Sequence, residues 1–205
     1  MERKIRQSPK LPAETRRQQL LESARRLFIK KGYRITTTEE IARNAGLTKG
    51  ALYFHFKSKE DILFEVIKGM SGKTGHHFDE NLRQARNLTD FFKMLMAAHE
   101  NVNCRDHWEM AEIWVQGMKI PRIKRFLCER LEQLVEDVVR HLRPAHDCSR
   151  AELRQLVLFV FAVHHGLAFV DTVAPRARNM KTQVKFVDRL SKTVRRDRKM
   201  TNRTT

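Results

Sequence analysis

The sequence predicts an all-α protein, and two patterns support this. Along most of the chain apolar residues recur every three or four positions, the spacing that places them on one face of an α-helix. Capping boxes, in which a Ser or Thr precedes a Glu by three residues, stand at Thr37 with Glu40 and at Ser149 with Glu152. No segment reads as a plausible strand, so we expect helices throughout.

Charge and length limit the classes of partner. The 205 residues include 41 Lys and Arg against 24 Asp and Glu, and the net charge of +17 favours a polyanion such as nucleic acid, although a solvated basic surface would give the same number. A membrane partner is not expected, because the longest apolar run, Leu156 to Val163, is far short of the roughly 20 residues that span a bilayer. The three cysteines are few and widely spaced, which is typical of a reduced, cytoplasmic protein.

The first helix is predicted to follow a basic arm. Residues 1–10 lack periodicity, and their basic residues either form a solvated tail or reach a minor groove. Pro12 suits the first turn of a helix, and Gly32 ends that helix. Tyr33 and Ile35 are expected to fill the corner after it. The apolar stripe of the helix consists of Leu20, Leu21, Ala24, Leu27 and Phe28.

Residues 36–56 contain two helix starts and a turn. The capping box at Thr37 opens a short helix, and Gly46 supplies the positive φ that ends it. Thr48 then caps a second helix. Two helices joined by a glycine-containing turn are the helix-turn-helix unit, whose second helix lies in the major groove of DNA.

The second of these helices has one face for packing and another for contact. Lys49 and Tyr53 are four residues apart on the contact face. Gly50 costs about 1 kcal/mol relative to alanine within a helix, so it indicates close approach of the backbone to a phosphate or base edge. Ala51 is small enough to meet a thymine methyl group. Lys59 stands in the first turn of the next helix, where its charge opposes the helix dipole unless a phosphate lies nearby.

These residues resemble the DNA-binding domain of the TetR family of bacterial repressors. The resemblance spans roughly residues 15–67 and implies an all-helical homodimer with three N-terminal helices on operator DNA and a divergent C-terminal domain for a small effector. By this resemblance Thr38, Lys49, Gly50, Tyr53, His55 and Lys59 match positions that family members use on DNA. The matching residues are Gly32, Tyr33, Thr36, Thr37, Ile41, Ala42, Ala45, Gly46, Thr48, Gly50, Leu52, Tyr53, His55, Phe56, Ser58, Lys59, Glu60 and Ile62.

The domain division is placed after residue 57. Residues 1–57, with the arm 1–10, form the predicted DNA-binding domain, and residues 58–205 form the effector-binding and dimerisation domain. A long helix from Ser58 to about Arg86 would join them, and the glycines between Gly69 and Gly75 leave open whether it kinks or breaks.

The last two long helices are the predicted dimer interface. The helix from Leu153 to Val170 is apolar all round, so one side can face its own domain and the other a second subunit. The final helix repeats apolar residues at close to 3.5-residue spacing between Met180 and Val194. The basic tail after it is expected to be disordered.

No catalytic set, metal site or cofactor is expected. Cys104, His107 and His99 are close in sequence, but their spacing fits no standard zinc site. An effector pocket is predicted on central helices, because large aromatics with one titratable group suit an apolar pocket with a polar anchor. The residues predicted to line it are Trp108, Trp114, Phe161 and His164.

The sequence therefore predicts a DNA-binding regulator and not an enzyme. The favoured function is a homodimeric repressor, cytoplasmic and associated with the bacterial nucleoid, which a small molecule releases from a palindromic double-stranded operator. The alternative is a nucleoid-type protein that coats DNA through its charge without reading sequence. The ratio of operator affinity to random-DNA affinity separates the two. The DNA-binding residues expected for the repressor are Thr38, Thr48, Lys49, Gly50, Ala51, Tyr53, His55 and Lys59.

Overall fold

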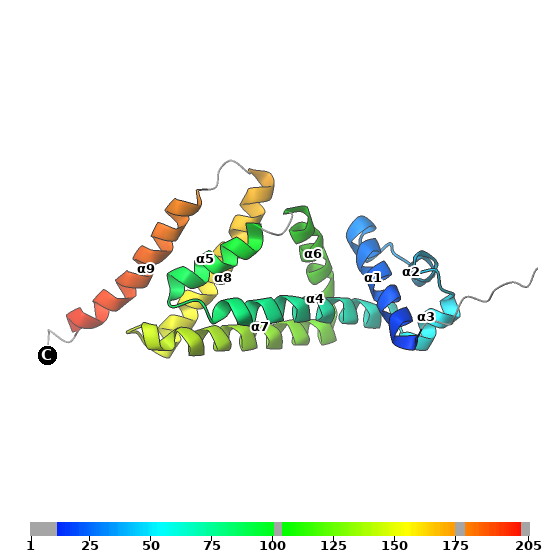
Figure 1. Ribbon diagram of the computed structural model, residues 1–205, viewed down its shortest axis with the longest axis horizontal. Coiled ribbons are helices and arrows are strands. Elements are labelled where there is room, and N and C mark those ends of the chain that lie inside the picture. The colour runs from blue at the N-terminus through cyan, green and yellow to red at the C-terminus, as the bar shows by residue number, and fades with distance from the viewer. Residues whose placement is uncertain (1–11, 101–103, 175–178, 202–205) are drawn as a thin grey trace, which may run out of the picture. The chain divides into compact units, whose positions relative to one another are not determined.

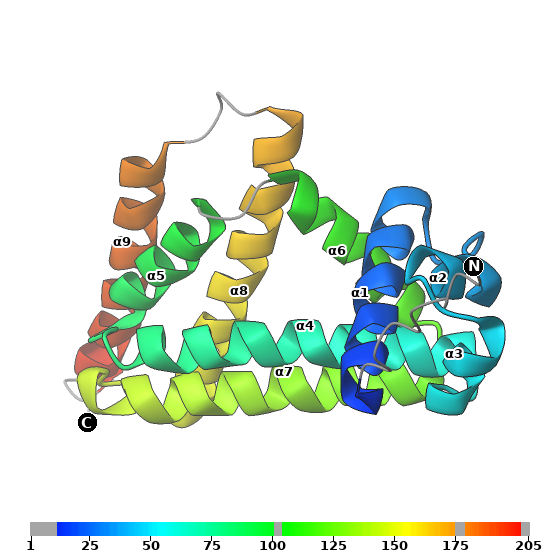
Figure 2. The same cartoon turned by 45° about the vertical axis from the view of Figure 1, so that its right-hand side comes forward.

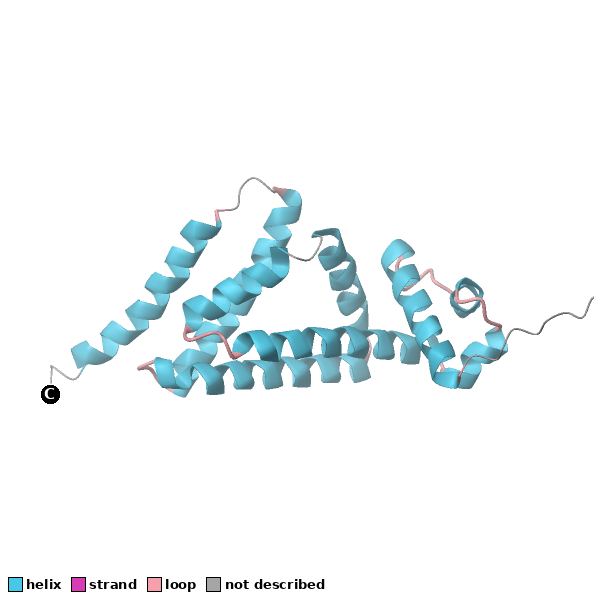
Figure 3. Cartoon of the chain, viewed as in Figure 1, coloured by secondary structure: helices cyan, strands magenta, loops and turns pink. Residues whose placement is uncertain are grey.

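The protein is described by a computed structural model, in which every regular element of the described residues is a helix (Figures 1 and 3). The described residues are 12–100, 104–174 and 179–201. Within these ranges the side chains of residues 72–77, 79, 98–100, 104–110, 168, 171–173 and 193–201 are not described. The basic arm at residues 1–10 lies outside the description.

The chain divides into two compact units that share two helices. The first unit comprises residues up to Met70 together with Glu112–Gly117, and the second comprises Ser71–Ala111 and the chain from Met118 onward. The shared helices are α4 (Lys59–Leu82) and α6 (Cys104–Gly117). Each of these two helices therefore contributes residues to both units.

Three helices precede α4 in the first unit: α1 (Ala13–Lys31) and the short helices α2 (Thr38–Asn44) and α3 (Lys49–His55). Leu20, Ala24 and Phe28 of α1 are buried as predicted, whereas Leu21 and Leu27 of the predicted stripe are only partly buried. Tyr33 packs edge-on against Phe28, with ring centroids 5.2 Å apart. The prediction for Ile35 is wrong, because its side chain is 67% exposed, so of the two predicted residues only Tyr33 packs into that corner.

Helix α4 is continuous across Gly69, Gly72 and Gly75, so the glycines do not break it. Its first turn is anchored by Ser58, whose hydroxyl accepts from the Asp61 N–H at 3.1 Å. Toward α1, the Arg17 guanidinium forms an ion pair with Glu65 and lies 5.4 Å from the centroid of the Phe56 ring. These contacts attach the start of α4 to the helices that precede it.

The second unit is built from α5 (Leu88–Glu100), α7 (Pro121–Leu142), a 3-10 turn (Arg143–Ala145), α8 (Arg150–Val173) and α9 (Met180–Thr201). Helix α5 packs against both α8 and α9, and α7 packs against α8 (Figure 2). Ser149 forms the predicted capping box with Glu152 at the start of α8.

The core of this unit is apolar and contains a phenylalanine cluster. The Phe161 ring meets Phe91 edge-on at 5.5 Å and stacks on Phe78 at 6.3 Å. Polar groups at the start of α5 are also satisfied: buried His146 accepts from the Leu88 N–H at 3.4 Å and donates from Nδ1 to the Leu142 carbonyl at 2.9 Å.

One prediction about the C-terminus is wrong. The tail was expected to be disordered from Arg195 onward, but α9 continues to Thr201. The basic residues of this segment stand toward the C-terminal end of the helix. The helix dipole favours positive charge at that end. Residues 202–205 lie outside the description.

Candidate nucleic-acid interface

Helices α2 and α3 are set by local caps and a glycine turn. Thr37 and Glu40 form a complete capping box at α2, and the Thr48 hydroxyl accepts from the Ala51 N–H at 3.1 Å at α3. Between the helices Gly46 has φ of 69°, a conformation that residues with a Cβ rarely adopt. The predicted helix-turn-helix geometry is therefore present.

A buried polar contact fixes α2 on α1. The Ser23 hydroxyl is fully buried, donates to the Ile41 carbonyl at 2.8 Å and accepts from the Asn44 amide at 3.0 Å. Leu52 of α3 is also fully buried. One side of the α2–α3 pair is thus packed against α1, and the opposite side is free to meet a ligand.

Glu40 adds a second bond between α1 and α2. Its carboxylate pairs with Lys31 and also accepts from the backbone N–H of Thr37 at 2.9 Å. The Lys31 ammonium, followed by the Thr37 N–H, lowers the pKa of Glu40 to about 2. The carboxylate therefore stays ionised, and the capping box stays formed, throughout the neutral range.

The exposed side of α2 and α3 carries a linked set of polar side chains. The Thr38 hydroxyl lies 3.2 Å from the Tyr53 hydroxyl, which joins the two helices. Lys49 forms an ion pair with Glu39, and its ammonium lies 5.9 Å from the centroid of the Tyr53 ring. Three of the residues predicted to contact DNA thus lie together on one face.

Glu39 is the member of this set that the sequence analysis missed. Hydrogen bonding to Lys49 lowers the pKa of Glu39, and the same bond raises the pKa of Lys49. Both groups therefore remain charged at neutral pH. The only sequence signal for the pair was one acidic residue on α2 and one basic residue ten positions later on α3, which spacing alone does not connect.

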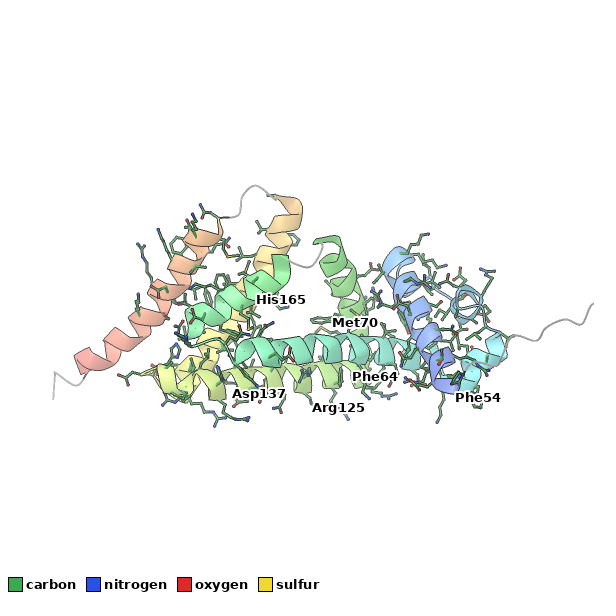
Figure 4. The ribbon with its side chains drawn as sticks, in the orientation of Figure 1. Phe54, Phe64, Met70, Arg125, Asp137 and His165 are labelled. Atoms are coloured by element: carbon green, nitrogen blue, oxygen red, sulfur yellow. The ribbon has the colours of Figure 1, made fainter. Side chains whose placement is uncertain are left out.

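The other α3 residues predicted to contact DNA are small or only half-buried. A Cβ built at Gly50 would have Thr48 Oγ1 as its nearest neighbour, at 3.9 Å, so nothing in the chain crowds this position. Ala51 and His55 are half-buried. The neighbouring Phe54, not among the predicted residues, is 80% exposed (Figure 4), which is unusual for a large apolar side chain.

The Lys59 side chain is partly buried and is bound to backbone carbonyls. Its ammonium donates to the carbonyls of Tyr33 at 3.1 Å, Arg34 at 3.2 Å and Thr36 at 3.0 Å. It also lies 4.6 Å from the Tyr33 ring centroid. These bonds use all three of its donors and resolve the conflict with the helix dipole without a phosphate. The phosphate contact predicted for Lys59 stays a prediction, and it would have to share or replace one of these bonds.

The residues predicted to line an effector pocket fall in different units. Trp114 belongs to the first unit and is partly exposed, whereas Phe161 and His164 belong to the second. Phe161 packs in the core beside Phe78 and Phe91. The Trp108 side chain lies outside the described residues, as do those of His99, Cys104 and His107.

The second unit has an apolar hollow of about 430 Å³ between α5, α8 and α9. Two exposed phenylalanines, Phe159 and Phe186, stand on its rim. The side-chain amide oxygen of Gln183, Oε1, is buried there and has no hydrogen-bond partner among the described residues. The residues that line the hollow are Phe92, Phe159, Val163, Leu167, Gln183, Phe186, Val187, Arg189 and Leu190.

The described part of the chain has neither a cluster of metal ligands nor a membrane-spanning helix. Its side chains include no group of three or more His, Cys, Asp or Glu placed to hold a metal ion. None of its helices combines the length and the apolar character that crossing a membrane requires.

The packed and exposed sides of α2 and α3 define the class of protein, a helix-turn-helix DNA-binding protein. The family model described as "Bacterial regulatory proteins, tetR family" matches residues 20–66, which include both helices. Residues 20–66 therefore contain the DNA-binding region of the TetR family of bacterial regulatory proteins.

Individual relatives agree with this family over part of their length. YerO of Bacillus subtilis (strain 168), an uncharacterized HTH-type transcriptional regulator, is 40% identical over 109 residues, which are 52% of this chain and 37% of YerO. The HTH-type transcriptional repressor KstR2 of Mycolicibacterium smegmatis is 35% identical over 102 residues, 48% of each chain. These matches span less than half of either relative.

The fold is also similar to solved structures. The transcriptional regulator FadR from Bacillus subtilis, in complex with stearoyl-CoA, superposes with a TM-score of 0.63 over 83% of this chain and 95% of that one. The sequences are 16% identical, so the comparison supports the fold only.

Proposed function

We propose that this protein is a sequence-specific transcriptional repressor that binds a palindromic operator as a homodimer and is released by a small-molecule effector. The observation that supports this proposal is the exposed face of α2 and α3, where Thr38, Lys49 and Tyr53 lie together. The opposite side of these helices is packed against α1. Side chains held in this way can be aligned with base edges, which carry the sequence information that phosphates lack.

Roles on DNA follow from the chemistry of each side chain. Tyr53 and Thr48 carry hydroxyls suited to phosphate oxygens, and His55 can serve the same purpose. Gly50 leaves room for the backbone to approach the duplex, and Ala51 can meet a thymine methyl group. Lys49 is the candidate for reading a base edge. Lys59 fixes the backbone of residues 33–36, which precede α2, through hydrogen bonds to the carbonyls of Tyr33, Arg34 and Thr36.

The dimer is proposed to form through α8 and α9. Phe159 of α8 is 49% exposed and Phe186 of α9 is 61% exposed, and both border the apolar hollow. Contiguous exposed apolar side chains of this kind mark association surfaces. A side chain of a second copy could fill the hollow and offer a donor to the buried Gln183 oxygen. The opposite face of α8, with Val157 and Val160, is already buried in its own core.

The effector is proposed to act through the two helices that belong to both units. Helix α4 carries Lys59 at its start and continues into the second unit, and α6 ends in the first unit beside α1. There Gly32, with φ of 88°, lies so close to Glu112 that a Cβ would be 3.1 Å from Oε1. A ligand that favours displaced positions of α4 and α6 would shift the recognition helices. The FadR complex with stearoyl-CoA supports a ligand site in this fold.

The effector prediction has a fluorescence test. A ligand that binds beside Trp108 or Trp114 should change their emission, and it should weaken operator binding through a coupling of about 1–3 kcal/mol. Because coupling is reciprocal, operator DNA should weaken ligand binding by the same factor. A ligand that quenches the tryptophans but leaves operator affinity unchanged would contradict the release mechanism.

The test of DNA recognition is selection of bound duplexes from a random pool, followed by footprinting. A repressor should enrich one pseudo-palindrome and protect two related half-sites, because two-fold symmetry in the protein imposes it on the site. The net charge of +17 also suits the alternative, a DNA-coating protein. That protein would enrich no sequence and would lose affinity steeply with salt on every duplex alike.

A further inference from the structure

The exposed face of α2 and α3 that carries Thr38, Lys49 and Tyr53 also carries the Glu39 carboxylate. The Glu39 carboxylate accepts from the Thr38 hydroxyl at 3.1 Å and forms an ion pair with Lys49. Because the Thr38 hydroxyl donates to Glu39, the hydroxyl of Tyr53, 3.2 Å away, donates to Thr38 in the absence of DNA, and a phosphate oxygen would have to replace Thr38 as its acceptor. Glu39 is thus the final acceptor for this group of side chains.

A carboxylate at this position is unfavourable for simple phosphate binding. Glu39 is 54% exposed in its side chain, and DNA phosphates would repel it. On a duplex it needs a hydrogen-bond donor, and the major groove offers the exocyclic amino groups of the bases. Among those, cytosine N4 is the one that acidic side chains characteristically contact.

The partner of Glu39 has matching chemistry. A lysine ammonium donates to O6 and N7 of guanine, which are the acceptors of the same base pair. The two side chains already touch, so they present an acceptor beside a donor. A G·C base pair presents the complementary donor beside acceptors in the major groove. The pair can therefore meet this edge without separating its charges, and neither charge is left unpaired.

We propose that Glu39 and Lys49 together are specificity-determining residues that read one G·C base pair in each operator half-site. Glu39 accepts from cytosine N4, and Lys49 donates to guanine O6 or N7. This inference rests on the proposed function and deepens it, since it names the base pair and adds a residue to the interface. It also explains why an acidic residue stands on the DNA-facing surface of a strongly basic protein.

The test compares the base preferences of the wild-type chain and three variants by selection from a random duplex pool. Glu39→Gln keeps the size of the side chain and removes its charge. Lys49→Met removes the ammonium. The matched control is Glu22→Gln, which removes an equally exposed carboxylate that is paired on α1 with Arg25.

The wild type should prefer G·C over A·T at one position of each half-site by about 5- to 150-fold, the range of a good base contact. Glu39→Gln should lose this preference or move it to A·T, because glutamine suits adenine. Lys49→Met should lose it at the same position. The control should keep it. Binding of Glu39→Gln to random duplex should also strengthen, because one carboxylate per subunit no longer repels phosphate.

The possible failures can be told apart. If the wild type enriches no sequence, the proposed function fails, and this inference fails with it. If the wild type enriches a palindrome and Glu39→Gln enriches the same one, only the inference is overturned. Equal strengthening on all duplexes with unchanged base preference would show that Glu39 merely repels phosphate. If Glu39→Gln and Lys49→Met lose base preference at different positions of the half-site, the two residues do not read the same base pair, and the inference is also overturned.

Discussion

Replacing Phe186 with aspartate should convert the proposed dimer into monomers without unfolding them. Phe186 lies on α9 and is 61% exposed in the single chain, so its ring contributes little to that chain's own core. A variant at Val160 or Phe161 would not serve, although the sequence places them on the same helix as the predicted interface. Both are buried within one subunit, and a charge there would unfold the chain.

The size of the effect follows from the exposed area. A phenylalanine buries about 150–250 Å² when fully covered, so the exposed part of Phe186 amounts to about 100–150 Å². At about 25 cal/mol per Å² this area contributes about 3 kcal/mol per subunit. Two copies give about 6 kcal/mol in a symmetric dimer, so the dissociation constant should rise about 10⁴-fold.

Sedimentation velocity across a concentration series measures this change. The matched control is Phe54→Asp, which places the same charge at an exposed phenylalanine on α3 and should leave the dimer intact. Circular dichroism should show native helicity for both variants. If Phe186→Asp still sediments as a dimer at the concentrations where the wild type does, the interface lies elsewhere and the assignment to α8 and α9 is wrong.

Three other substitutions test separate contacts. Lys59→Met should lower the free energy of unfolding by about 1–3 kcal/mol, because three carbonyls lose their donor, whereas Lys57→Met, at an exposed neighbour, should be nearly neutral in chemical denaturation. Folding lowers the pKa of Glu40 from 4.5 to about 2, so its contribution is full above about pH 4.5 and is lost as the pH falls toward 2. Glu40→Gln should therefore lower Tm at neutral pH, and a difference that persisted unchanged at pH 2 would contradict this. His146→Leu should cost about 1–3 kcal/mol in denaturant unfolding, because the buried Leu88 N–H loses its acceptor; unchanged stability would show that water replaces the imidazole.

The helix starts could be predicted from the sequence because caps are local. Thr37, Thr48 and Ser149 each bond to a backbone N–H three residues ahead, so the signal and its partner stand within one turn. The positive φ of Gly46 was likewise encoded by its position between two helices. The contact residues proposed on α3 were predicted from the family resemblance, which also rests on residues close together in the sequence.

Contacts between distant residues could not be predicted in this way. The Lys59 ammonium meets carbonyls more than twenty positions earlier in the chain, and the sequence favoured a phosphate instead. The Glu39–Lys49 pair needs the relative placement of two helices, which periodicity does not supply. Helix α8 shows the same limit: its pattern is apolar all round, and only packing reveals that Phe161 faces inward while Phe159 faces outward.

The central claim is that α3 reads a sequence, and the most direct measurement is the ratio of two affinities. The dissociation constants of the full chain for the selected palindrome and for a scrambled duplex of equal length should be compared at physiological salt. The claim predicts at least about a 10³-fold preference for the palindrome, with two chains per site. A ratio near one at every salt concentration, with both affinities falling in parallel, would contradict it.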